Sequence, residues 1–381
     1  MTTSSTSSSE PGRRARWARL PWAGLLALLA LLALDTLATG LRGPWQWLDT
    51  ENPNSAAGSR LELKQLVQQP RQRPRIVVVG TSRVIDGFDT PLAEELLPEV
   101  AIAKLAYPRF EPFAILALVP DLIAAGADAV CLIASEQDTH RPLRLEPVPG
   151  ASTASLAALR ELLRVTDWRF AVDNRTALYR LAGTSALGLY RFRPDIHLAG
   201  VEAWRRFVLD EERIPSVRSR EDPFRPVSLW GAERNPVPAA ALRSTFDLFP
   251  PMMDQWNARM QSGVVQEITR GPHVAVQMAL YRRAAERLRE AGIEVVILQG
   301  VMHPAANDLF DTSITAEFLA FGSGLERDLG VRFVPRSEQP PFAESDFYDL
   351  LHTNHVGAAK ITRRMVEELR EAPIAWGSAG S

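Results

Sequence analysis

Two patterns of apolar residues alternate along the chain from about residue 74 onward. Short β-branched runs end abruptly at glycine or polar residues, and between them lie stretches in which apolar residues recur every three or four positions. A short continuous apolar run is typical of a parallel strand buried on both faces, whereas the longer periodic stretches are typical of amphipathic helices. Their alternation predicts an α/β fold, with helices covering both faces of a parallel sheet.

The expected strands are residues 76–79, 100–105, 129–134, 293–298 and 331–334. Helices are expected at residues 113–125, with Pro120 inside, at 356–369, and around the stripe Met278, Tyr281, Ala285 and Leu288. Gly126 and Gly292 are expected to end two of them. Residues 141–272, rich in Arg, Pro and aromatics, break the alternation and are interpreted as an insertion with helical pieces at 155–165 and 201–209.

A Leu/Ala-rich stretch precedes this domain. Residues 20–41 can cross a bilayer, which takes about 20 residues. Four arginines precede the stretch, which predicts a cytoplasmic N-terminus: Arg13, Arg14, Arg16 and Arg19. Tryptophans at both ends favour an uncleaved anchor: Trp17 and Trp22 on one side, and Trp45 and Trp47 on the other. The alternative is a signal peptide cleaved near residues 38–40. Either interpretation places the remaining chain in the periplasm or outside the cell.

The expected organisation is a disordered cytoplasmic tail (1–19), an anchor (20–41), a tether (42–73), one domain (74–372) with its insertion (141–272), and a disordered tail (373–381). At 381 residues and 46% hydrophobic composition the chain can bury a substantial core. A net charge of −2 gives no general attraction to nucleic acid. The single cysteine, Cys131, excludes an intrachain disulfide and is expected in the core.

Candidate chemistry begins at Gly80-Thr81-Ser82, directly after the first expected strand. Gly80 allows a tight strand-to-helix turn that leaves Ser82 at the carboxyl edge of the sheet, where ligands of open α/β sheets bind. The Ser82 N–H would lie near a helix N-terminus, where a developing oxyanion is stabilised. The alternative is that these residues serve only turn and capping chemistry.

A second polar stretch, Asp349-Leu350-Leu351-His352-Thr353-Asn354-His355-Val356-Gly357, lies where the last expected helix begins. An Asp three residues before a His can reach the imidazole and fix its tautomer, which a serine nucleophile requires of its base. Asn354 is expected to cap the helix, and Gly357 to let it pack closely. The alternative is a polar loop with a cap and a surface histidine.

Together, Gly-x-Ser after the first strand and Asp-x-x-His-x-Asn-x-x-Gly before the last helix resemble the SGNH (GDSL-type) hydrolase superfamily, over about residues 74–370. With its anchor and insertion, the chain is most similar to the membrane-tethered extracytoplasmic branch, which includes proteins of alginate O-acetylation and teichoic acid D-alanylation. The resemblance implies a flavodoxin-like three-layer αβα sandwich without a cofactor. It also implies that Ser82 is the nucleophile, His352 the general base and acid, and Asp349 the residue that orients His352.

The chain departs from the superfamily pattern at the oxyanion-binding blocks. The second block normally offers a glycine N–H, but the loop here is Leu105-Ala106-Tyr107-Pro108, so Ala106 or Tyr107 would supply it. The third block normally offers an asparagine, but Ser135-Glu136-Gln137-Asp138 stands here, which leaves Ser135 or Gln137 as donor. Losing one oxyanion donor typically costs about 10²–10³ in rate, so a slow enzyme or a catalytically silent relative is compatible with the sequence.

Other polar residues are weaker candidates. His303, after the fourth strand, is expected at the same sheet edge and is a candidate substrate contact, although a loop histidine without a catalytic part is favoured; His140 and Arg141 are interpreted in the same way. No metal is expected, because His303, Asp308, Asp349 and His352 have no recognised ligand spacing. Arg83 and Arg109 could steer an anionic polysaccharide or hold a carboxylate, but such arginines are more often solvated.

The leading functional hypothesis is an exported, membrane-anchored serine acyl enzyme. It would transfer or remove acyl groups, most simply acetyl, on cell-envelope polysaccharide through an ester on Ser82. A membrane-bound acyl-transferring protein is the candidate partner. One alternative is a general lipase or esterase. Another is a non-catalytic component that binds glycan or a membrane partner carrying acyl groups. The substrate in all three rests on resemblance rather than on the residues.

Overall fold

The computed structural model describes residues 73–106, 110, 112–140, 143, 156–186, 273–307, 312–347 and 351–374, together with 26, 27 and 29–34. Within this part of the chain, five parallel strands form one sheet in the order β2-β1-β3-β4-β5. The strands are β1 (Arg75–Gly80), β2 (Ala101–Ala106), β3 (Ala129–Ala134), β4 (Glu294–Gln299) and β5 (Arg332–Val334). All five expected strands are therefore confirmed, each within two residues of its expected bounds.

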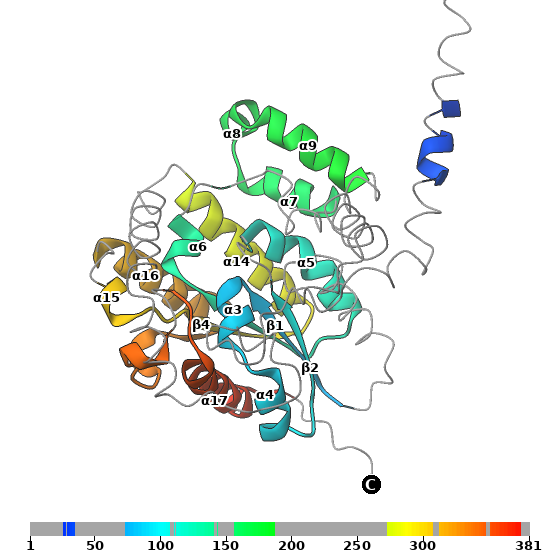
Figure 1. The fold of residues 1–381 in the computed structure, drawn as a ribbon. Coiled ribbons are helices and arrows are strands. Elements are labelled where there is room, and N and C mark those ends of the chain that lie inside the picture. Colours follow the sequence, from blue (N-terminus) through cyan, green and yellow to red (C-terminus); the bar gives the residue numbers. More distant parts are fainter. Residues whose placement is uncertain are drawn as a thin grey trace, which may run out of the picture.

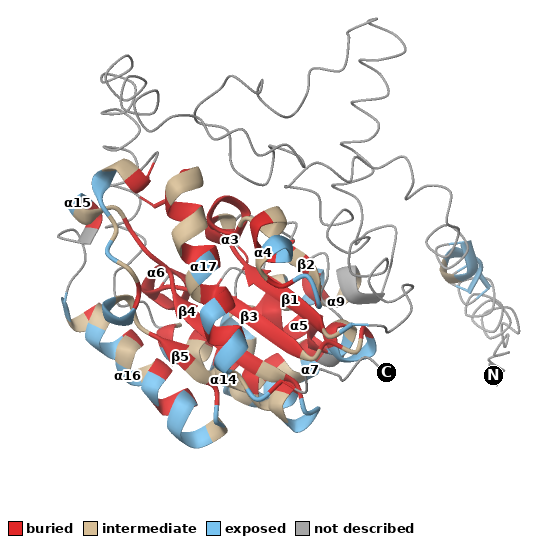
Figure 2. Cartoon of the chain, turned by 90° about the horizontal axis from the view of Figure 1, so that it is seen from below, coloured by how far each residue is buried: buried red, intermediate tan, exposed pale blue. Residues whose placement is uncertain are grey.

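Helices cover both faces of this sheet (Figures 1 and 2). One face packs against α3 (Ser82–Gly87), α4 (Thr90–Leu96) and α17 (His355–Glu371). The other packs against α5 (Pro112–Ala124), α14 (Val274–Glu290) and α16 (Thr312–Leu329). Along β1, Ile76 and Val78 belong to the first core and Val77 and Val79 to the second, as the two-residue period of a strand requires. The predicted parallel α/β fold is confirmed at this level.

Gly126 and Gly292 end α5 and α14 with positive φ angles of 63° and 77°, as expected. Four α-helices among the described residues outside the insertion were not expected: α4, α6 (Glu136–His140), α15 (Pro304–Asn307) and α16. Gly322 and Gly324 weaken the local helix signal of α16. Gly322 is required by packing, because a Cβ there would lie 2.5 Å from the ring of Phe333 on β5.

The described part of the insertion contains α7 (Leu156–Val165), α8 (Trp168–Asp173) and α9 (Arg175–Ala186). The expected helix at 155–165 is confirmed, and the one at 201–209 lies outside the described residues. Ala158 and Leu162 of α7 belong to the core shared with α5 and α14. Arg283 of α14 also donates to Glu161 at 2.9 Å, so α7 is held against the main sheet.

Near the N-terminus, residues 26, 27 and 29–34 are helical, and Leu26, Leu29, Leu31 and Leu34 are exposed. No helix within the described residues has both the length and the apolar character needed to cross a membrane. The expected anchor at 20–41 and the tether at 42–73 lie largely outside those residues. Cys131, in contrast, is confirmed as a core residue of β3, where burial raises the pKa of its thiol.

Candidate active site

Ser82 occupies the turn that joins the central strand β1 to α3. Thr81 is the N-cap of this helix, and its hydroxyl accepts the Arg83 backbone N–H at 3.3 Å. The turn requires glycine at position 80, because a Cβ there would lie 2.5 Å from Val84 Cγ2 and 3.1 Å from the Ile133 carbonyl oxygen. The strand therefore ends abruptly, and Ser82 is the first helical residue at the carboxyl edge of the sheet, as predicted.

His352 lies just before α17, in a loop held by its neighbours. The Asn354 side chain caps the helix by accepting the N–H groups of Val356 at 2.9 Å and Gly357 at 3.3 Å, and its amide donates to the Ser345 carbonyl at 2.7 Å. A Cβ on Gly357 would lie 2.4 Å from the Asp346 carbonyl oxygen. The predicted cap and the predicted close packing at Gly357 are both confirmed.

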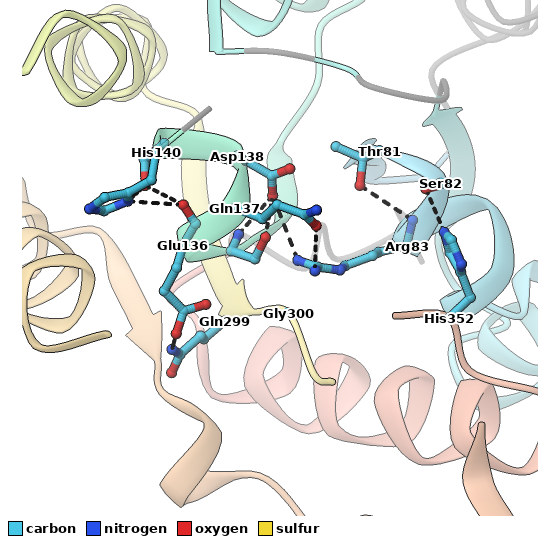
Figure 3. Close-up of polar contacts among 12 residues, drawn as sticks. Thr81, Ser82, Arg83, Glu136, Gln137, Asp138, His140, Gln299, Gly300 and His352 are labelled. Carbon is cyan, nitrogen blue, oxygen red and sulfur yellow. Dashed lines mark hydrogen bonds and ion pairs between the residues drawn. The ribbon is translucent and has the colours of Figure 1, made fainter. Parts of the chain in front are cut away.

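The two polar stretches meet at one contact. His352 Nε2 lies 2.8 Å from Ser82 Oγ (Figure 3), and both side chains are half-buried, so solvent or a ligand can reach them. With the ring proton on Nδ1, Nε2 accepts the serine hydroxyl, which is the arrangement that activates a serine. The expected contact is present. Asp349 lies outside the described residues, and its orienting role stays a prediction.

The structure describes three of the four expected oxyanion donors. Ala106 is the last residue of β2 and pairs with Gly80, so it lies at the right edge of the sheet, while Tyr107 is outside the described residues. Ser135 was a wrong candidate, since both its backbone N–H and its hydroxyl donate to Asp138 Oδ2 at 2.8 Å. The oxygen of the Gln137 carboxamide accepts from Arg83 at 3.0 Å, and the expected role of Gln137 as an oxyanion donor stays a prediction.

The interpretation of Arg83 as solvated is wrong. Its side chain is only 6% exposed, and the guanidinium reaches Gln137 and approaches Asp138 Oδ2 to 4.0 Å. Arg109 lies outside the described residues, as do Arg141 and Asp308. A buried arginine directly after a candidate nucleophile is a feature that local sequence patterns did not reveal.

The two further histidines have structural partners. His303 is half-buried, its Nδ1 accepts the Ala305 N–H at 3.1 Å at the start of α15 (Pro304–Asn307), and its ring meets Phe347 edge-on at 5.6 Å. Its role as a substrate contact stays a prediction. His140 is not a loop residue: it is fully buried at the end of α6, with Nδ1 3.0 Å from the Glu136 carbonyl oxygen.

A second buried polar cluster lies beside the first and was not foreseen. Glu136 is fully buried, accepts from Gln299 at 2.7 Å, and forms an ion pair with Arg336. Arg336 also donates to the Gly300 carbonyl at 2.7 Å, so the cluster ties the ends of β3, β4 and β5 together. Among the described residues, no group of three or more His, Cys, Asp or Glu side chains is arranged to hold a metal ion.

Comparison of the chain with family models finds no match, and a search of curated proteins finds no significant match either.

Proposed function

We propose that the chain is a membrane-anchored serine acyl enzyme that works outside the cytoplasm on cell-envelope polysaccharide. The observation that carries the proposal is the 2.8 Å contact between Ser82 Oγ and His352 Nε2 at the carboxyl edge of the sheet. A serine hydroxyl is a weak nucleophile until a base within hydrogen-bond reach removes its proton. A half-exposed Ser–His pair at the edge where α/β sheets bind ligands meets that requirement.

The proposed reaction has two halves. His352 Nε2 takes the Ser82 proton as Oγ attacks the acyl carbon, and the protonated imidazole then gives that proton to the leaving alcohol. Water or a sugar hydroxyl next attacks the acyl group on Ser82, with His352 again acting first as base and then as acid. Asp349 is proposed to orient the imidazole. The overall reaction is a transesterification when a sugar hydroxyl attacks and a hydrolysis when water attacks. Neither reaction involves oxidation or reduction, and no cofactor is proposed.

The strand order 2-1-3-4-5 supports a flavodoxin-like sandwich, since it is one of the two common orders of doubly wound parallel sheets. The resemblance to the SGNH superfamily supports the choice of acyl chemistry, and its membrane-tethered branch supports a polysaccharide substrate. The Leu/Ala-rich residues 20–41 support a single anchor with the N-terminus in the cytoplasm. A membrane-bound acyl-transferring protein is the proposed partner if the chain is a transferase.

One observation favours a second candidate, a non-catalytic binding component of a polysaccharide-modifying complex. Both Ser135 donors are committed to Asp138, and the third block lacks its usual asparagine. A poorly completed oxyanion site would lower turnover by about 10²–10³ per missing donor. The binding component would therefore keep the fold and bind glycan without measurable turnover.

The experiment uses the full chain in detergent and a small activated acetyl ester. Wild type should release acetate, and Ser82→Ala and His352→Ala should each abolish that release, because the two residues act as a unit. Ser323→Ala, at an exposed position on α16, is the matched serine control and should keep full activity. Adding O-deacetylated envelope glycan should divert acetyl from water to sugar if the chain is a transferase. Wild-type turnover equal to that of Ser82→Ala on both ester and glycan would contradict the enzyme proposal and support the binding component.

A preference for long acyl chains over acetyl would instead support a general lipase. The same assay distinguishes this outcome if the ester series runs from acetyl to dodecanoyl. Turnover should fall along that series for a polysaccharide acetyl enzyme.

A further inference from the structure

The three described helices of the insertion form an additional layer outside the helices that cover the sheet. Figure 1 shows α7, α8 and α9 beyond α5 and α14, on the side of the sheet opposite to α4 and α17. Leu162, Phe170 and Leu181 are buried and belong to the core that includes α5 and α14. The inner side of this layer is therefore held by apolar packing, which leaves its outer side to solvent.

Large apolar side chains remain on that outer side. Trp168 is 71% exposed, Val172 52% and Tyr179 77%. Only Asn174 separates α8 from α9, and both its N–H and its carbonyl form backbone hydrogen bonds to residues four positions away, so the helical turns continue. Trp168, Val172, Arg175 and Tyr179 thus recur at spacings of four, three and four and form one stripe, which we call the outer stripe.

Arginines surround the outer stripe. Among the described residues 158–183, the exposed charged side chains are five arginines and two aspartates: Arg160, Arg164, Asp167, Arg169, Asp173, Arg175 and Arg180. The Arg169 guanidinium lies over the Trp168 ring, 5.6 Å from its centroid, so a cation and an aromatic ring share this surface. The outer side of α7–α9 is therefore cationic, although the whole chain has a net charge of −2.

This combination of side chains fits a lipid surface with anionic headgroups. Trp and Tyr rings are enriched at the depth of the headgroups, because they are apolar with one polar end. Arginine stems lie along apolar surface while their guanidinium groups remain at the charged headgroups. The exposed aliphatic side chains of Leu163 and Val172 suit hydrocarbon and have no hydrogen bond to offer a sugar hydroxyl, so a bilayer fits better than a glycan.

We infer that the outer stripe and the arginines around it dock the domain onto the anionic lipid leaflet that faces it. The inference rests on the proposed function, which includes an anchor at residues 20–41. Residues 42–73, the expected tether, can span at most about 110 Å even if fully extended. The domain is therefore confined near the membrane that holds its anchor, and docking is an intramolecular step with a high effective concentration.

Docking through α7–α9 would fix an orientation that a tether alone leaves open. Ser82 begins α3 and His352 lies just before α17, and both of these helices pack on the opposite face of the sheet. The candidate active site therefore remains accessible in the docked state. Envelope polysaccharide could reach the Ser82–His352 pair while α7–α9 contacts lipid.

The test places a fluorescent probe beside the outer stripe in the full chain. Thr176→Cys introduces an exposed thiol on α9, whereas the natural Cys131 is buried and should not react. The chain is labelled with an environment-sensitive dye and reconstituted in phosphatidylcholine nanodiscs that contain a lipid-borne quencher, with or without phosphatidylglycerol. The dye at position 176 should be quenched and blue-shifted in discs with phosphatidylglycerol. The same dye at Glu94→Cys, exposed on α4 across the sheet, should show neither change.

Charge and apolar contributions are then separated by substitutions at exposed positions. Arg175→Gln should lower the ratio of docked to undocked chains about fivefold at low salt, since one arginine near an anionic surface contributes on that order. Trp168→Ser combined with Tyr179→Ser should lower it by at least about tenfold. Arg363→Gln, at an exposed position on α17, is the matched arginine control and should leave the ratio unchanged.

Equal quenching at positions 176 and 94, or no quenching at 176 in either disc, would overturn the inference. A dye at 176 that responds to soluble anionic glycan but not to lipid would assign the surface to glycan and overturn it as well. Ser82-dependent turnover, measured in the same discs, separates the two proposals: loss of docking with turnover intact contradicts only this inference, and docking without turnover contradicts only the acyl chemistry. A chain that does not remain in the discs would overturn the anchor on which the inference rests.

Discussion

Ser82 Oγ and His352 Nε2 lie 2.8 Å apart although 270 residues separate them in the sequence. Two close backbone approaches make this contact possible. Gly80 lets β1 turn sharply into α3, and Gly357 lets α17 press against the loop that carries His352. The geometry of the pair thus depends on glycines that take no part in chemistry.

Gly357→Ala should damage both stability and activity. The added methyl group would lie 2.4 Å from the Asp346 carbonyl oxygen and 2.8 Å from Thr353 Cβ, so the loop next to His352 must shift. We expect a loss of about 1–3 kcal/mol in the free energy of unfolding, measured by urea denaturation. Gly324→Ala in α16 is the control, because its nearest neighbouring atom is 3.8 Å away. Equal stability of the two variants would argue against the close approach.

Arg336→Met should be strongly destabilising, because it leaves the fully buried Glu136 carboxylate with Gln299 but without its cation. Removing one partner of such a pair typically costs about 3–5 kcal/mol. Adding Glu136→Gln should recover most of that loss, since the remaining group is then neutral. A double-mutant cycle by chemical denaturation measures this coupling, and additive effects would show that the ion pair contributes little.

Acid should destabilise the fold partly through His355. Burial lowers the pKa of its imidazole, an effect that the nearby Asp89 carboxylate opposes only in part. The unfolded chain therefore binds the proton more readily than the folded one, and the free energy of unfolding falls as pH drops below the ordinary histidine pKa of about 6.5, until the lowered folded pKa is passed.

His355→Gln should remove this part of the pH dependence, measured as Tm between pH 8 and 5. Asp89→Asn keeps a side chain able to cap α4, removes the opposing charge, and should make the acid dependence steeper. An unchanged Tm profile in His355→Gln would assign the dependence to other groups.

The proposed anchor predicts that residues 43–381 lie outside the cytoplasm. A reporter active only in the periplasm, fused after Ser381, should give signal, and mass spectrometry should find the N-terminus intact in the membrane fraction. Replacing Arg13, Arg14, Arg16 and Arg19 with glutamate should reduce correct insertion, because cytoplasmic positive charge sets orientation. A mature chain that begins near Leu41 would instead identify a cleaved signal peptide.

Much of the fold follows from local patterns. The apolar runs of β1 and β3 are buried at every position and that of β4 at all but the first, so burial favours strands there, and parallel strands bring their carboxyl ends to one edge. That rule predicts Ser82 at the carboxyl edge, whereas its pairing with His352 was expected from the resemblance to the SGNH superfamily. The α16 helix was missed because Gly322 lowers helix propensity for a reason that only Phe333, on another element, reveals.

The buried polar contacts were less accessible to sequence reasoning. Arg83 is buried because it contacts Gln137, which is 54 residues away in the sequence, and because Gly300 leaves space for its side chain. Neither condition can be seen in the residues next to Arg83. A signal did exist for Ser135, since Ser-x-x-Asp before a helix is the pattern of a side chain that bonds locally. This pattern in Ser135-Glu136-Gln137-Asp138 indicates that Ser135 is committed to Asp138, as the structure shows.

The most direct test of the central claim is covalent labelling of Ser82. A fluorophosphonate reacts with a serine only when a neighbouring base activates it. Peptide mass spectrometry of the labelled full chain should find the phosphonate on Ser82 in wild type, none in Ser82→Ala, and at most a trace on Ser82 in His352→Ala. A folded wild-type chain that remains unlabelled at Ser82, or a His352→Ala chain labelled at the wild-type rate, would contradict the account.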